Sequence, residues 1–462
     1  RVLFRSGRRL KGWRAPDTSV NTETEFSLRT LRNRSRDLTR NNTYATKYVD
    51  LVANNIVGIG IVPRIKSVEK QNKSLEKKAA KLSALWKDWA ESGECSVDEQ
   101  LEFGGLENLV ARTVAESGEA IVRRIRNAKK ETVPFEIEVL EPDYLDELKN
   151  EELSNGGVII QGVEFNKQRK RVAYWLFDEH PGDMRGVTYK SRRVDASDIK
   201  HIFKPVRAGQ VRGIPWLAPV MVKLKDFDEY EDAQLVRQKV AACFSGFVED
   251  AFPDNSTSLS DETNTAFDGR LEPGIIETLP TGKRITFPNT PQVTGYKEFS
   301  SVTLHAIASA GGVTYESLTS DFSGVNFSSG RMGMIDMNRN IDVWQWHFFI
   351  PQFCRGVFKW FKEGAELRGY DISGIMEEWT TPKRPIIDPS TEVTASAKAI
   401  RTGQISWAET VRSLGYDPDD VLSEIKEYND KADKLGIILD SDPRKTMEGG
   451  SLQANVKDAQ AK

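Results

Sequence analysis

The sequence predicts an α+β protein of several domains, and three observations lead to this fold class. The length of 462 residues is enough for roughly two to four domains with separate cores. Apolar residues recur at helical spacing before residue 119 and after residue 214, whereas between 119 and about 201 they alternate as in strands. A stretch over 246–291, rich in Pro, Gly, Ser, Thr and Asp, interrupts the later helices and indicates a small inserted unit.

Residues 1–43 are predicted to form a basic N-terminal arm. Residues 1–47 contain twelve Lys or Arg and four Asp or Glu, a local balance of +8 in a chain whose total charge is −3. Thr22 and Glu25 predict a capping box, followed by a helix with arginines at every fourth position on one face. This face is either a solvated helix surface or a contact with an acidic partner or phosphate. Its candidate contact residues are Arg29, Arg32, Arg36 and Arg40.

Residues 44–214 are predicted to form an α+β unit. Helical spacing of apolar residues gives way to alternation within it, and glycines mark several element ends. The predicted elements are, in order, a helix over 44–55 ended by Gly58, a strand over 57–61, amphipathic helices over 75–89 and 106–114, and strands from 119 to about 201 with a hairpin turn at 166–169.

Two helical segments, 215–245 and 292–312, flank the insert over 246–291. Two short strands are predicted within the insert, at 274–279 and 284–287. It also holds eight Asp or Glu against three Lys or Arg, a balance of −5. An insert of this size and composition is marginal as an independent unit, so we expect neighbouring chains to complete it.

Residues 313–387 are predicted to contain an exposed loop and a long buried helix. The preceding helix ends at Gly311-Gly312, and a loop of small polar residues runs from Ser320 to Gly330. Such a loop has too few apolar residues for a core, and loops held on a rigid scaffold often carry function. The following helix has apolar residues at alternating spacings of three and four, and we expect it to end at Pro351. These apolar residues are Met334, Met337, Ile341, Trp344 and Phe348.

Residues 388–450 are predicted to form three short helices. Asp388-Pro389, Ser406 and Asp417-Pro418 mark the starts, and glycines follow each helix. The outline is that of a helix-turn-helix, but the third helix is acidic, and phosphate would repel an acidic recognition helix. The last twelve residues, 451–462, have the composition of a disordered tail.

Several classes of protein are disfavoured by the sequence. No apolar run approaches the roughly 18 residues of a membrane helix, and the basic first residues lack the apolar core of a signal peptide. Three widely spaced cysteines and four unclustered histidines predict a reduced setting with neither disulfides nor a metal. Phosphate-loop, serine-hydrolase and zinc-protease signatures are missing, so we expect no enzyme and no cofactor. A chain that begins with Arg1 rather than Met is expected to be trimmed or processed.

Three blocks of the sequence resemble the lambda-like family of tailed-phage portal proteins. The block over 307–331 keeps Ile307-Ala308, Gly312, Tyr315-Glu316, Leu318-Thr319, Asp321-Phe322-Ser323, Asn326-Phe327-Ser328-Ser329 and Arg331. The block over 21–45 keeps Asn21, Glu23, Leu31-Arg32, Arg34-Ser35-Arg36-Asp37, Arg40-Asn41-Asn42 and Tyr44-Ala45. The block over 273–299 keeps Pro273-Gly274, Leu279-Pro280, Gly282, Phe287, Pro291 and Phe299.

The resemblance implies a multidomain portal fold and a subunit that forms rings. The implied domains are an α/β wing over 44–214, stem helices over 215–245 and 292–312, a clip over 246–291, a tunnel loop with a long wing helix over 313–387, and a helical crown over 388–450. A ring of twelve such subunits would occupy one capsid vertex of the virion, assembled in the host cytoplasm, and double-stranded DNA would pass through it without being read for sequence. The alternative is a DNA-binding regulatory protein that uses the basic arm and the C-terminal helices.

The resemblance also implies sites and partners. The tunnel loop would face DNA through Ser320, Asp321, Phe322, Ser323, Asn326, Ser328, Ser329 and Arg331. The clip would bind the large subunit of terminase and later the head–tail connector or adaptor, through Ile276, Lys283, Arg284 and Phe287. The arm would meet the major capsid or scaffold protein. Part of the acidic charge of the clip would line the DNA path and prevent sticking, unless it is only a solvated outer face.

Overall fold

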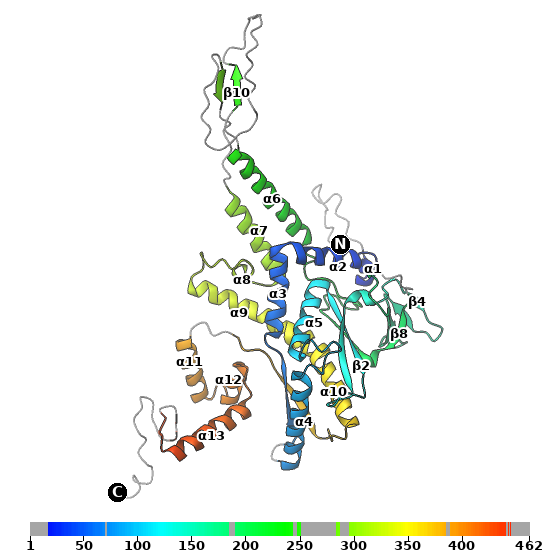
Figure 1. Ribbon diagram of the computed structural model, residues 1–462, viewed down its shortest axis with the longest axis vertical. Coiled ribbons are helices and arrows are strands. Elements are labelled where there is room, and N and C mark those ends of the chain that lie inside the picture. The colour runs from blue at the N-terminus through cyan, green and yellow to red at the C-terminus, as the bar shows by residue number, and fades with distance from the viewer. Residues whose placement is uncertain are drawn as a thin grey trace, which may run out of the picture. The chain divides into compact units, whose positions relative to one another are not determined.

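A computed structural model describes most of the chain (Figure 1). The described residues are 17–69, 72–183, 190–243, 247–250, 283–286, 295–384 and 389–439, together with Asp442 and Arg444. They divide into two compact units. Unit 1 comprises Arg1–Arg32, Val49–Pro215 and Asn326–Lys462, and unit 2 comprises Asn33–Tyr48 and Trp216–Val325.

The N-terminal helices begin at a different residue from the predicted one. Ser19 is the N-cap of α1 (Val20–Glu25), and its hydroxyl accepts a hydrogen bond from the Thr22 N–H at 3.2 Å. The predicted capping box of Thr22 and Glu25 is therefore wrong, because both residues lie inside α1. A turn at Phe26 and Ser27 interrupts the helical backbone, and α2 (Leu28–Asn41) follows.

The next helices match the prediction, but the first strand lies further along the chain. α3 (Thr43–Val57), α4 (Lys73–Glu91) and α5 (Phe103–Ser117) cover the predicted segments. The predicted strand over 57–61 is wrong: Gly58 and Gly60 both have positive φ, and Ile59 between them is fully exposed. The strand is β1 (Val62–Ser67), which pairs antiparallel with β12 (Ile375–Thr380).

Two antiparallel sheets occupy the middle of unit 1. Three strands lie in the order β3-β2-β9, and five lie in the order β4-β5-β6-β7-β8. The predicted turn at 166–169 is confirmed, since Asn166 N–H donates to the Lys170 carbonyl and Arg169 has a φ of +60°. A core containing Ile121, Val163 and Tyr174 joins the sheets.

The strands of these sheets are β2 (Glu119–Arg126), β3 (Phe135–Leu140), β4 (Glu151–Glu152), β5 (Val158–Ile160), β6 (Val163–Phe165), β7 (Arg171–Leu176), β8 (Arg192–Asp195) and β9 (Ile199–Phe203). Short 3₁₀ turns at η2 (Pro142–Tyr144) and η3 (Ala196–Asp198) connect some of them.

The long helix does not end at Pro351, as the sequence predicts. α9 (Phe327–Trp344) continues through a π-helical stretch, η4 (Gln345–Cys354), into α10 (Arg355–Leu367) (Figure 1). Pro351 lies inside η4, where the wider turn relieves the clash that proline makes in an α-helix. The predicted burial of Met337, Ile341, Trp344 and Phe348 is confirmed, whereas Met334 is only half-buried. Beyond them, an aromatic core joins α4, α5, η4 and α10 through Trp86, Trp89, Phe103, Phe353, Phe358 and Phe361.

Unit 2 contains the helices predicted on either side of the insert. They are α6 (Met221–Cys243) and α7 (Tyr296–Gly311), followed by the short α8 (Tyr315–Thr319). Within the insert, β10 (Phe247–Asp250) pairs antiparallel with β11 (Lys283–Thr286), which overlaps the second predicted strand. The first predicted strand, 274–279, lies outside the described residues.

The three C-terminal helices match the sequence signals. They are α11 (Pro389–Arg401), α12 (Trp407–Ser413) and α13 (Pro418–Leu435). The Ser406 hydroxyl and the Asp417 carboxylate accept capping bonds from Glu409 N–H and Asp419 N–H. The predicted tail over 451–462 lies outside the described residues. Within the described part of the chain, no helix combines the length and the apolarity that crossing a membrane requires.

Candidate functional site

The loop over 320–326, between α8 and α9, has a fixed backbone at its start. The Thr314 hydroxyl caps α8 by accepting a bond from Ser317 N–H at 3.1 Å. Ser320 then adopts a left-handed backbone with a φ of +57°, and its N–H donates to the Glu316 carbonyl at 2.8 Å. A non-glycine residue in this conformation costs energy and persists because the surrounding hydrogen bonds hold it.

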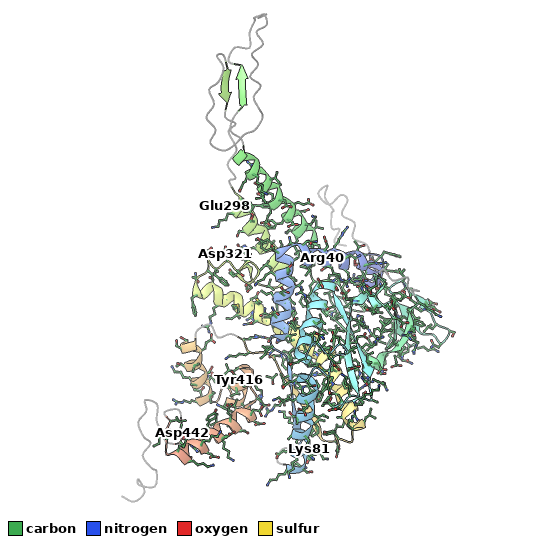
Figure 2. All side chains as sticks on the ribbon, viewed as in Figure 1. Arg40, Lys81, Glu298, Asp321, Tyr416 and Asp442 are labelled. Atoms are coloured by element: carbon green, nitrogen blue, oxygen red, sulfur yellow. The ribbon has the colours of Figure 1, made fainter. Side chains whose placement is uncertain are left out.

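Asp321 organises the tip of this loop (Figure 2). Its carboxylate accepts a bond from Ser323 N–H at 3.0 Å, and its own N–H donates to the Thr319 hydroxyl at 3.2 Å. The hydrogen bonds from Ser323 hold the pKa of Asp321 below its ordinary value, so the carboxylate stays charged at neutral pH. Phe322 beside it is 66% exposed. The loop therefore presents an aromatic ring next to a negative charge, in addition to the small polar groups that the sequence analysis emphasises.

The end of the loop forms a capping box for α9. Asn326 accepts a bond from Ser329 N–H at 2.8 Å, and the Ser329 hydroxyl accepts one from Asn326 N–H at 3.2 Å. These two side chains hold the helix start, whereas Ser328 is exposed. Arg331 lies 4.0 Å from Glu392 of α11. Of the predicted loop residues, Ser320 to Ser323 form the turn, and Asn326 and Ser329 form the cap.

Residues far away in the sequence hold the scaffold of the loop within unit 2. The Tyr48 hydroxyl of α3 donates to the Gly311 carbonyl at 3.1 Å. A side chain at Gly311 would overlap the Tyr48 ring, so this close approach requires glycine. The His305 and Tyr315 rings stack in parallel, with centroids 4.0 Å apart. Sequence reasoning missed Tyr48, because no local pattern marks a contact between α3 and α7, and it missed the stacking of His305 on Tyr315 of α8.

The structure corrects the prediction for one arginine of the basic arm. Arg32 is 1% exposed, and its guanidinium pairs with Asp143 at 3.4 Å and Glu147 at 2.8 Å, so it is a buried contact within unit 1. Arg29 and Arg40 are exposed, and Arg36 is half-buried. Asn21 also bonds the Gly209 carbonyl, which ties α1 to the body of unit 1. Residues 17–32 are therefore not a free arm, and residues 1–16 lie outside the described part.

A buried ionic network lies between the two sheets of unit 1. The Glu119 carboxylate accepts bonds from His201 Nε2 at 2.8 Å, Arg212 Nε at 2.8 Å and Gly213 N–H at 2.6 Å. Burial would raise the pKa of Glu119, but Arg212 and His201 outweigh it and hold this pKa well below its ordinary value. Burial lowers the pKa of His201 to about 4. The network is fully hydrogen-bonded, and it fixes β2, β9 and the 207–213 segment relative to one another.

Glu107 is a second buried acid that the sequence analysis missed. Its carboxyl accepts a bond from Ile61 N–H at 2.7 Å and lies 3.5 Å from the Cys354 sulfur. Burial raises the pKa of Glu107 to about 8, so the group is uncharged at neutral pH. Its position joins α5, the segment before β1 and η4.

One group of possible metal ligands lies close together among the described residues. The ligand atoms of Glu141, Asp143 and His180 lie within 4.8 Å of one another. His180 Nδ1 accepts a bond from Gly182 N–H at 3.0 Å, His180 Nε2 lies 3.4 Å from Glu141, and Asp143 pairs with Arg32. Asp143 is thus occupied by the Arg32 guanidinium, and His180 Nδ1 by Gly182 N–H.

The predicted docking residues of the insert are only partly described. Lys283 and Arg284 lie in β11, in register with Asp250 and Glu249 of β10. Ile276 and Phe287 lie outside the described residues.

Comparison with known proteins decides the family. A model of the lambda family of phage portal proteins matches residues 6–345. This chain belongs to the lambda family of phage portal proteins. A probable portal protein of Halomonas phage phiHAP-1 is 30% identical over 445 residues, which cover 92% of this chain and 83% of that relative. Portal protein B of Escherichia phage lambda is 24% identical over 358 residues, which cover 70% of this chain and 67% of that relative.

The mixed helix and sheet of this portal protein agree with the predicted fold class. A chain in the virion of a native gene transfer agent particle has a similar fold, with a TM-score of 0.50 and 16% identity. The match covers 85% of this chain and 94% of that chain. Portal proteins are structural components rather than enzymes. The regulator alternative is not favoured, since α13 carries Asp419, Asp420, Glu424 and Glu427 within its first ten residues.

Proposed function

We propose that this portal protein forms a ring of twelve subunits at one vertex of a phage capsid in the virion. Double-stranded DNA passes through the central channel during packaging and leaves through it during ejection, without being read for sequence. The observation that carries the proposal is the portal family match over residues 6–345. Assembly takes place in the host cytoplasm, before the ring joins the shell or scaffold protein.

Exposed apolar side chains on α6 and α7 support contacts between subunits. Val302 is 71% exposed and Val236 is 57% exposed, and Val222 and Phe299 also face solvent in the isolated chain. Apolar groups in this number on two adjacent helices of unit 2 are typical of a surface that another chain covers. In the proposed ring, α6 and α7 are the stem helices, and neighbouring subunits bury these residues.

The loop over 320–326 is the proposed contact with DNA in the channel. Its carboxylate and the lack of Lys or Arg between Ser320 and Gly330 disfavour tight phosphate binding. Such a surface lets DNA slide through a channel, because tight phosphate contacts, formed with the release of counterions, would hold the DNA in place. The loop therefore guides the duplex through Phe322 and small polar groups.

The insert over 246–291 is the proposed clip, the docking face for the large terminase subunit and then for the head–tail connector. Its balance of −5 becomes −60 in twelve copies, and part of this charge would line the DNA path. The remaining regions follow the domain assignment from the sequence, with residues 44–214 as the wing and 388–450 as the crown. The exposed arginines Arg29 and Arg40, with the half-buried Arg36, are the proposed contacts with the shell or scaffold.

The mass of the purified protein tests the ring. Twelve chains of 52.0 kDa give a particle of about 620 kDa, which mass photometry separates from a monomer or a dimer. Val302→Asp combined with Val236→Asp should abolish the ring, because a buried charge at each interface is repeated twelve times. Leu148→Asp is the matched control, since Leu148 is exposed on the other unit. A small species in the unsubstituted protein would refute the ring, and a ring in the double variant would refute the assigned interface.

A further inference from the structure

The C-terminal helices, residues 389–439, share little apolar surface with the rest of unit 1. Among the side chains described in this segment, only Val411 and Pro418 are buried. By contrast, α10 alone buries Val357, Phe358, Trp360 and Phe361. Regions with few buried apolar contacts are the ones that separate from a fold at low cost. Apolar packing therefore does not fix the position of the C-terminal helices.

Ion pairs hold these helices instead. Arg64 of β1 is 13% exposed and reaches the start of α13, where its Nε lies 2.8 Å from Asp417 and its terminal nitrogen pairs with Asp419. Arg331 of α9 lies 4.0 Å from Glu392 of α11. These contacts join the C-terminal helices to β1 and α9 by charge.

Another ion pair and a ring contact attach the segment that precedes these helices. Arg384 pairs with Asp342 of α9. Lys383 lies over the ring of Tyr416, 5.8 Å from its centroid, and Tyr416 lies between α12 and α13 (Figure 2). The attachment is thus polar along its length.

A cavity of about 1120 Å³ lies where these helices meet β1, α4 and the start of α5. Its lining includes Ile59, Trp86 and Glu107 on one side and residues 414–417, Asp419 and Asp420 on the other. Protein interiors are close-packed, so a hollow of this size means that the two sides do not interlock. This groove is lined by apolar side chains such as Ile59 and Trp86 and by charged ones such as Arg64 and Lys87.

We propose that the C-terminal helices are a movable cover over this groove, held closed by Arg64, Arg331 and Arg384. Partly exposed ion pairs weaken as salt screens them, whereas buried apolar packing does not. Because little apolar surface holds the cover, breaking the ion pairs frees it while each helix keeps its own hydrogen bonds. The proposal concerns a single subunit and does not depend on the ring or on DNA transport.

Energy transfer between two dyes tests the cover. One dye is attached at Lys77→Cys on α4 and the other at Ser423→Cys on α13, both exposed positions, with Cys243 replaced by Ser. Burial raises the pKa of the Cys95 and Cys354 thiols, which keeps them poorly reactive. Labelled chains are diluted with unlabelled chains, so that transfer within one subunit is measured. The variants are Arg64→Gln and the control Lys431→Gln, which removes one positive charge from the Glu427–Lys431 pair within α13.

The expected result is a fall in transfer when NaCl rises from about 0.1 M to about 1 M, where the screening length shrinks from about 10 Å to 3 Å. Arg64→Gln should show the fall already at low salt, and Lys431→Gln should not. The helical circular dichroism should stay constant throughout. Unchanged transfer in both high salt and Arg64→Gln would overturn the cover. A fall accompanied by loss of helix would overturn it too, because unfolding rather than movement would then explain the change.

Discussion

Removing the buried arginine of the Glu119 network should destabilise unit 1 more than removing an exposed one. Arg212 has no exposed side-chain surface, and it donates to Glu119, to the Gln161 carbonyl at 3.1 Å and to the Pro142 carbonyl at 3.3 Å. Arg212→Met keeps the approximate length of the side chain and removes all of these donors. A buried carboxylate that loses its closest cation costs about 3–5 kcal/mol. With an unfolding entropy of about 2.1 cal/mol/K per residue, this corresponds for a unit of roughly 340 residues to a fall in Tm of about 4 to 7 °C.

Thermal unfolding followed by intrinsic tryptophan fluorescence is the assay. Arg126→Met is the matched control, since Arg126 is exposed and its pairing with Asp198 at 3.0 Å lies in solvent. The double variant Arg212→Met with Glu119→Gln removes both charges and should recover part of the lost stability. A Tm for Arg212→Met within about 2 °C of the parent would refute the reasoning. So would a double variant that is less stable than the single one.

Three further expectations follow from the described contacts. Glu107→Gln should raise the Tm at pH 8 and leave it nearly unchanged at pH 4. The pKa of Glu107 is about 8 in the folded chain and lower in the unfolded chain, so protonated Glu107 contributes fully to stability below the unfolded pKa and this contribution is lost as pH rises toward 8. Equal Tm shifts at both pH values would contradict this. Gly311→Ala should lower the free energy of unfolding by about 1–3 kcal/mol through overlap with the Tyr48 ring, and Tyr48→Leu in the same chain should recover part of it in a denaturant titration. Deleting residues 321–324 should leave the number of subunits in the ring unchanged but reduce DNA packaging or retention, measured as genome copies per particle. Unchanged packaging and retention would contradict the proposed role of the loop.

Stability should also fall as the solution becomes acidic, because of His201. The pKa of His201 is about 4 in the folded chain and higher in the unfolded chain. Neutral His201 therefore contributes fully to stability at pH values above the unfolded pKa, and this contribution is lost as pH falls toward 4. A Tm profile recorded from pH 7 to pH 4 should show this loss, and His201→Gln should flatten it. A profile of the same slope in both chains would assign the acid sensitivity to other groups.

Local signals in the sequence were sufficient for most helices. The Ser406 and Asp417 caps and the glycines that follow the C-terminal helices lie within a few residues of the backbone groups that they satisfy, so their effect is readable from spacing. The same reasoning failed at Thr22, where Ser19 also has a capping hydroxyl and the actual helix start decides between them. It failed at Pro351 because the apolar packing around η4 outweighs the usual effect of proline.

The site was predicted less completely than the fold, for a related reason. The position of the loop over 320–326 follows from its composition. The spacing of Arg32 predicts an exposed arginine face, whereas in the structure Arg32 is paired with Asp143 and Glu147. The partners of Glu119 lie 82 and 93 residues further along the chain. No periodicity or spacing encodes contacts of this kind, because they exist only once the sheets have packed.

The continuity of α9, η4 and α10 has a mechanical consequence. The three segments comprise 18, 10 and 13 residues without a break, which corresponds to a rod roughly 60 Å long. One end is the capping box at Asn326, and the other is clamped by the aromatic rings around Phe361. A force on the capped end of α9 is therefore transmitted along the helix axis to α10. The π-helical stretch contains Pro351, which lacks a backbone N–H donor, and it is where the continuous helix bends most easily.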